Sequence, residues 1–227
     1  MRRIMLVTIS LMLAFVFATP LSKPGFAADM KEEMKMKGKE MMESTSTKAT
    51  ALRVSLNSLL REHVFLAAAA TDAALGGRDA EFKASAGALD ANSVDLSKAI
   101  GSVYGTDAEK AFLPLWRKHI GFVVDYTTGV ATKDKPKQDK AVADLVQYTM
   151  DFGAFMHSAS PALPAETVAD LVKTHVLTLK AVIDAQAAKD WTKTYTSLRE
   201  AAAHMQMIAD PLSETIINQF PEKFTAK

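Results

Sequence analysis

Three histidines recur in the sequence at a constant interval, each inside a similar segment. His63, His119 and His175 follow one another every 56 residues, in the strings LLREHVFL, LWRKHIGF and LVKTHVLT. Each histidine has a basic residue two positions before it and a β-branched residue directly after it. Imidazole is the commonest metal ligand in proteins and suits zinc, copper and iron. The first chemistry that the sequence predicts is therefore metal binding.

A second polar position accompanies each histidine at the same interval. In the last predicted helical hairpin, His175 and His204 lie about equally far from a turn near Lys189. At about 1.5 Å of rise per residue, antiparallel packing of the two helices sets these histidines level with one another. The same register places His63 beside Asn92 and His119 beside Tyr148. Each hairpin is thus expected to hold one histidine next to one further polar group.

Three arrangements of these side chains are compatible with the sequence. If the hairpins close around a pseudo-threefold axis, the three repeated histidines converge and leave a fourth coordination position open. If the hairpins stack in a row, only His175 and His204 form an adequate pair. In the third arrangement the histidines are core residues, and the accompanying polar groups satisfy their hydrogen bonds. The ligand residues proposed from the sequence, in order of preference, are His175, His204, His119 and His63, supported by Asn92, Tyr148 and Asp151.

Methionines favour copper as the metal. Met205 and Met207 follow His204 in the string HMQM, and five methionines fall in MKEEMKMKGKEMM between residues 30 and 42. Thioethers are soft ligands that select Cu(I), so copper is the first choice, with zinc or b-type haem as alternatives. The other interpretation of the charged methionine-rich segment is a frayed helix whose methionines favour helicity. Asp151 is either an acceptor for an imidazole N–H or a solvated acid.

The elements that would position these residues are helices. Apolar residues recur at three- and four-residue intervals from Ala51 onward, and no segment alternates with the two-residue period of a strand. The fold predicted is all-α, a six-helix bundle built from three tandem helical hairpins of 56-residue period. The first four helices are expected at about 51–75, 80–104, 107–131 and 139–158, with a loop at 132–140.

The chain ends predict export from the cytoplasm. Arg2 and Arg3 precede an apolar run from Ile4 to Ala18 and a small-residue site, which is typical of a signal peptide over 1–27. A flexible tether over 28–50, the bundle over 51–221 and a tail over 222–227 are expected to follow. The protein should be secreted or in the cell envelope, with no transmembrane anchor after processing.

Composition removes several other classes of function. The absence of cysteine leaves no disulfide, thiolate site or cysteine-linked haem, and 27 basic against 26 acidic residues predict no nucleic-acid partner. No hydrolase, zincin or nucleotide-binding motif occurs, so no catalytic residue is assigned. The function expected is that of a secreted, non-enzymatic metal-binding protein. The alternative is an extracellular or cell-envelope scaffold that binds another protein, of unknown identity, with its histidines as core packing.

The strings NSVDLSKAIGSVYG, WRKHIGFVVDY and AAAHMQMIADPL resemble a family of secreted bacterial helical proteins. The resemblance covers the chain from Leu52 to Phe220 and implies the same leader, the same hairpin order and histidines at the four positions named above. Some members carry the description "copper amine oxidase". Such oxidases are large β-sandwich proteins with a tyrosine-derived quinone, so the resemblance implies no such activity for this short helical chain. His157 and the methionine-rich segment match no part of the family pattern.

Overall fold

The structure of the protein is a computed structural model that describes residues 47–224, together with Glu32 and Lys35. The predicted signal peptide, most of the predicted tether and the last three residues of the predicted tail lie outside the described residues. All regular secondary structure in the described part is helical, which confirms the all-α class. The helices are α2 (Lys48–Leu75), α3 (Asp79–Tyr104), α4 (Thr106–Ala131), α5 (Lys135–Ala159), α6 (Ala165–Ala187), α7 (Trp191–Gln219) and the short α8 (Pro221–Phe224).

Side-chain caps explain where α2, α5 and α7 begin. The side chain of Asp134 accepts a hydrogen bond from the backbone N–H of Lys137, and Asp190 caps α7 in the same way. The loop predicted over 132–140 is confirmed only for residues 132–134, because α5 already begins at Lys135. Its proline lies in the first turn, where a missing N–H breaks no helical bond. Helix α2 begins at Lys48, inside the predicted tether, with Thr47 as its N-cap.

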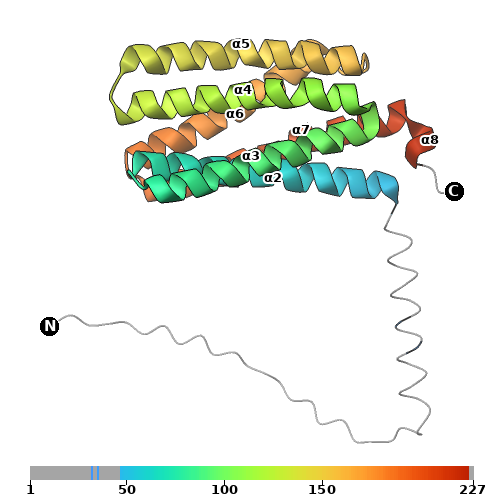
Figure 1. The fold of residues 1–227 in the computed structure, drawn as a ribbon, viewed down its shortest axis with the longest axis horizontal. Coiled ribbons are helices and arrows are strands. Elements are labelled where there is room, and N and C mark those ends of the chain that lie inside the picture. The colour runs from blue at the N-terminus through green and yellow to red at the C-terminus, as the bar shows by residue number, and fades with distance from the viewer. Residues whose placement is uncertain (1–31, 33–34, 36–46, 225–227) are drawn as a thin grey trace, which may run out of the picture. The chain divides into compact units, whose positions relative to one another are not determined.

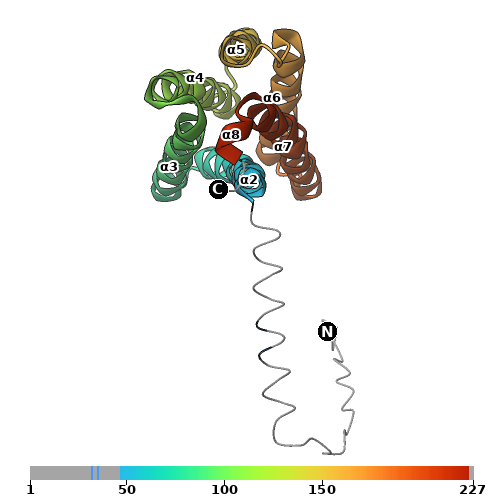
Figure 2. The ribbon, with the colours of Figure 1, turned by 90° about the vertical axis from the view of Figure 1, so that its right-hand side faces the viewer.

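The long helices form one bundle. Figure 1 shows them running along a common direction, and the end-on view in Figure 2 shows them arranged around a shared interior. Each long helix packs against the next one in the chain, and α7 also packs against α2, so the sequence of contacts closes on itself. The helices that carry the repeated histidines, α2, α4 and α6, also contact one another. This closure brings residues from three separate segments to one interior region.

Apolar side chains fill the interior of the bundle. Each large one that is fully buried stabilises the fold by about 1.5–3 kcal/mol relative to leaving it exposed. The largest apolar side chains with almost no exposed surface include Leu56, Leu96, Leu179, Ile183 and Ile216. None of the helices among the described residues is long and apolar enough to cross a membrane. Because the interior is largely apolar, any polar group inside it needs a hydrogen-bond partner or a ligand.

One close helix contact yields a stability prediction. A Cβ atom at Gly153 on α5 would overlap with the carbonyl oxygen of Ala165 at the start of α6. Gly153→Ala is therefore expected to lower the free energy of unfolding by about 1–3 kcal/mol. Gly121 on α4 is the matched control, because it is exposed and nothing lies near its added Cβ. Gly121→Ala should raise the free energy of unfolding by about 0.5–1 kcal/mol.

Urea unfolding of both glycine variants measures these changes. A Gly153→Ala protein as stable as the Gly121→Ala protein would show that α5 and α6 do not approach each other this closely.

Candidate metal centre

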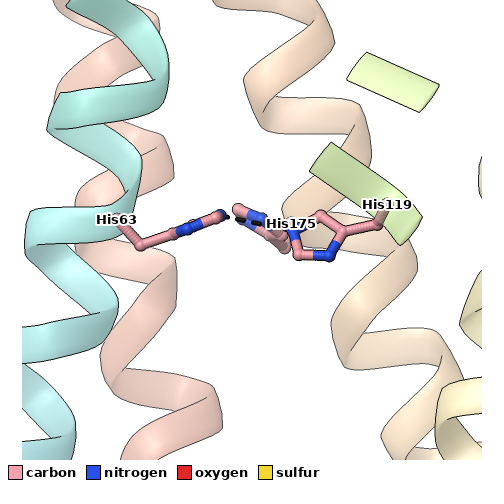
Figure 3. A group of neighbouring side chains, drawn as sticks. All are labelled: His63, His119 and His175. Atoms are coloured by element: carbon pink, nitrogen blue, oxygen red, sulfur yellow. Dashed lines mark hydrogen bonds between the residues drawn. The ribbon is translucent and has the colours of Figure 1, made fainter. Parts of the chain in front are cut away.

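Three histidine side chains meet in the interior of the bundle. His63 extends from α2, His119 from α4 and His175 from α6, and Figure 3 shows the three rings directed toward one another. One ring nitrogen from each residue lies within 4.8 Å of the corresponding atoms of the other two. Their exposed fractions are only 1%, 2% and 3%. The arrangement can hold a metal ion, and it corresponds to the converging arrangement considered from the sequence.

The spacing of two of these nitrogens suits metal coordination. The Nε2 atoms of His63 and His119 are 3.4 Å apart. Two ligands bound tetrahedrally to zinc at about 2.0–2.1 Å are separated by about 3.3–3.4 Å. A hydrogen bond between two nitrogens would be better formed at about 3.0 Å. The pair is thus already at ligand spacing, and one ring nitrogen of His175 belongs to the same set of atoms within 4.8 Å of one another.

Burial keeps all three imidazoles neutral. Burial first, and then the neighbouring His119 and His175, lower the pKa of His63 well below its usual value. Burial, with a smaller effect of His175, lowers the pKa of His119 to about 3, against an opposing effect of the Trp116 main chain. Burial and His204 lower the pKa of His175 to about 4. Neutral imidazole has a free lone pair, so the rings need to lose no proton before they bind a metal.

The protein supplies few hydrogen bonds to these rings. Both ring nitrogens of His175 and the Nδ1 atom of His63 have no partner within the described part of the chain. Buried polar atoms are nearly always paired, because an unpaired one costs about 1–3 kcal/mol. A cluster with several unpaired nitrogens has lone pairs that could hold a metal ion.

His204 does not join the cluster, although the sequence ranks it with His175 as the best ligand pair. Its Nε2 atom lies 2.8 Å from the carbonyl oxygen of Leu171, which is one helical turn before His175. Asn92 makes the equivalent contact in the first hairpin, donating to the carbonyl oxygen of Leu59 at 3.0 Å. These side chains meet the neighbouring helix one turn away from the histidine rather than level with it. Each joins two helices and does not bond to an imidazole.

The other residues expected to support the site divide between interior and surface. Tyr148 is buried, with its ring centroid 4.9 Å from that of His119. Asp151 is half-exposed, where it accepts a hydrogen bond from Gln147 and lies 4.0 Å from the Lys118 amine, so it does not support an imidazole.

The two methionines next to His204 also lie in different places. Met205 is buried and lines the same interior cavity as His119 and His175, whereas Met207 is 59% exposed and faces solvent. Of the two expected soft ligands, only Met205 lies near the cluster. His157 is exposed, and its Nδ1 atom lies 2.8 Å from the carbonyl oxygen of Leu163.

Trp116 belongs to the site and was missed from the sequence. Its ring centroid lies 4.6 Å from that of His119 and 5.0 Å from that of His63. Its indole N–H is buried and unpaired among the described residues. The signal that could have found it is its position three residues before His119, because residues three apart share one face of a helix.

Two cavities reach the histidine cluster. A cleft of about 340 Å³ between α2, α3 and α4 is lined mainly by apolar side chains and includes His63 and His119. A smaller interior cavity of about 40 Å³ includes His119 and His175. Both cavities thus border candidate ligands, and His119 lines both of them.

Comparison with protein-family models, curated proteins and solved structures found no match to this chain. The resemblance to secreted bacterial helical proteins stays a prediction. The chemistry of the centre is therefore inferred from its own geometry.

Neutral buried imidazoles predict an acid-sensitive metal-free protein. The three histidines titrate near pH 6.5 when unfolded and at lower pH when folded. The unfolded chain consequently binds more protons below about pH 6.5, so stability is present above that pH and is lost as the pH falls toward 4. The slope is up to about 1.4 kcal/mol per pH unit for each histidine.

Urea unfolding of the metal-free protein between pH 7.5 and 4.5 measures this loss. His175→Gln should reduce the slope, because it removes one of the buried imidazoles whose pKa is lowered. A metal-free protein equally stable at both ends of the range would contradict the burial of three neutral imidazoles.

Proposed function

We propose that the protein is a metal-binding helical bundle with one tris-histidine centre formed by His63, His119 and His175. The observation that carries this proposal is the approach of three buried imidazoles from three helices, with two Nε2 atoms 3.4 Å apart. Three protein nitrogens around a tetrahedral ion leave the fourth position open. A binding role needs nothing further from the protein, and we propose no enzymatic reaction.

Copper is the metal that we favour, with zinc as the alternative. Imidazole ligands suit both ions. No carboxylate joins the histidine cluster among the described residues, so a bound ion keeps its full charge in an apolar interior. By Born scaling, burying a monovalent ion costs about a quarter as much as burying a divalent one of the same size. Cu(I) fits that constraint, and Met205 is a soft side chain that lines the same interior cavity as His119 and His175.

The geometry argues against b-type haem, the third expected cofactor. The three histidine ring centroids are only 5.3, 5.6 and 6.3 Å apart. Trp116 packs against two of the same rings. This spacing leaves no slot in which a planar macrocycle could lie between the imidazoles.

We also propose that the bundle consists of three tandem hairpins related by a 56-residue period. His63, His119 and His175 occupy equivalent places on α2, α4 and α6. Asn92 donates to a carbonyl oxygen of α2 and His204 to one of α6, and these matching hydrogen bonds support the 56-residue repeat. A repeated unit explains how one chain supplies three equivalent ligands around one point.

The setting that we propose for this function is outside the cytoplasm. The signal-peptide pattern over 1–27 favours it. We retain the family resemblance as part of this proposal. The competing function is a cell-envelope scaffold whose histidines only fill the core, and metal titration separates the two.

Metal titration tests the proposed centre directly. The purified protein is expected to bind one equivalent of Cu(I) or Zn(II), and saturation should raise its melting temperature, because a ligand present at about 100 times its Kd adds about 2.7 kcal/mol. His63→Gln, His119→Gln and His175→Gln should each abolish stoichiometric binding. Calorimetry and metal analysis after dialysis provide the readouts.

The matched control is His204→Asn. Asparagine is the residue that makes the equivalent carbonyl contact in the first hairpin, so this variant should fold and bind metal normally. Binding lost in His204→Asn but kept in His175→Gln would move the site to His204. A melting temperature that ignores both metals would favour the scaffold.

A further inference from the structure

Two unpaired hydrogen-bond donors lie next to the histidine cluster. The indole N–H of Trp116 and the hydroxyl of Tyr148 are buried and have no partner among the residues that the structure describes. Both side chains line the interior cavity of about 40 Å³ that also includes His119 and His175. Because an unpaired buried donor is costly, two of them beside one set of candidate ligands indicate a missing acceptor.

The charge of the centre indicates what kind of acceptor is missing. Three neutral imidazoles leave the charge of a divalent ion uncompensated, and no described carboxylate belongs to the cluster. An isolated charge in an apolar interior is strongly unfavourable unless it is paired. Two acids considered near the site are engaged elsewhere, since Glu62, next to His63, accepts from Asn92, and Asp151 accepts from Gln147. A compensating negative charge therefore has to come from a ligand that is not part of these side chains.

We propose that the divalent form of the centre binds one small monoanion at its open fourth position, and that Trp116 and Tyr148 donate hydrogen bonds to it. This inference rests on the proposed function, because it requires a metal on the three histidines. The interior cavity of about 40 Å³ is small, so we expect a ligand of a few heavy atoms, of the hydroxide, azide or cyanide class. Hydroxide can form from a metal-bound water, whose pKa a divalent ion lowers toward neutrality.

The cleft provides a way in for such a ligand. It opens between α2, α3 and α4 and reaches His119, which also borders the interior cavity. Its walls are mainly apolar, but they also include the acidic Asp79 and the hydroxyl residue Thr127. The route suits small molecules, and specificity arises at its inner end, where the metal and the two donors lie.

Azide titration of the Cu(II)-loaded protein tests this inference. Azide bound to Cu(II) gives a ligand-to-metal charge-transfer band, so its Kd can be measured optically. Tyr148→Phe and Trp116→Phe each remove one donor and keep an aromatic ring, and each should weaken azide binding about tenfold or more without changing the copper stoichiometry. Tyr126→Phe is the matched control, because that hydroxyl donates to Asp184 at 2.6 Å, about two turns from His119 along α4.

The stability of the metal-free variants gives a second readout. Tyr148→Phe should be as stable as the unmodified protein or more stable, because it removes a buried hydroxyl that has no protein partner. Tyr126→Phe should be less stable, because it loses a hydrogen bond. A metal-free Tyr148→Phe protein that is clearly destabilised would contradict the absence of a partner.

The outcomes separate this inference from the proposed function. Copper-loaded protein that does not bind azide, or that binds it equally well in Tyr148→Phe and Trp116→Phe, overturns the anion site and leaves the metal centre standing. Protein that takes up no metal overturns both. Azide weakened equally by Tyr126→Phe would show a general structural effect and would also overturn the role of the two donors.

Discussion

Three neutral imidazoles are buried in an otherwise apolar interior, and this burial determines what the site can bind. Protonating any one of them inside the bundle would place an unpaired charge among aromatic and aliphatic side chains. The depressed pKa values of His119 and His175, about 3 and about 4, express that cost. The same burial keeps the nitrogen lone pairs free. The burial that disfavours protonation of the imidazoles thus leaves them ready to bind a metal ion without first losing a proton.

The closed arrangement of helices holds the ligands on rigid elements. Each histidine lies within a helix of more than twenty residues rather than in a loop, which fixes its position along the helix axis. Asn92 joins α3 to α2 one turn before His63, and His204 joins α7 to α6 one turn before His175. At the equivalent place in the second hairpin, Tyr148 packs on the His119 ring instead. Asn92 and His204 therefore make structural hydrogen bonds, whereas the hydroxyl of Tyr148 at the matching position has no partner among the described residues.

Much of this could be predicted from the sequence, and the exceptions have physical causes. Helical periodicity identified the fold class, and the 56-residue interval identified the histidines that converge. His204 was chosen as a ligand because the hairpin register places it opposite His175, but that register is accurate only to about one helical turn. In the structure His204 lies opposite Leu171, one turn before His175, and bonds to its carbonyl oxygen. Helix α5 began early because Asp134 caps it, a contact that a run of charged residues conceals. Convergence itself depends on α7 packing against α2, which links distant parts of the chain and leaves no local signal.

X-ray absorption at the metal edge of the metal-loaded protein tests whether three imidazoles coordinate one buried ion. We expect three imidazole nitrogens at about 2.0–2.1 Å, recognised by the scattering of their outer ring atoms. His204→Asn should give the same spectrum. A first shell dominated by oxygen, or one with fewer than two imidazoles, would place the ion on the surface and contradict a buried tris-histidine centre.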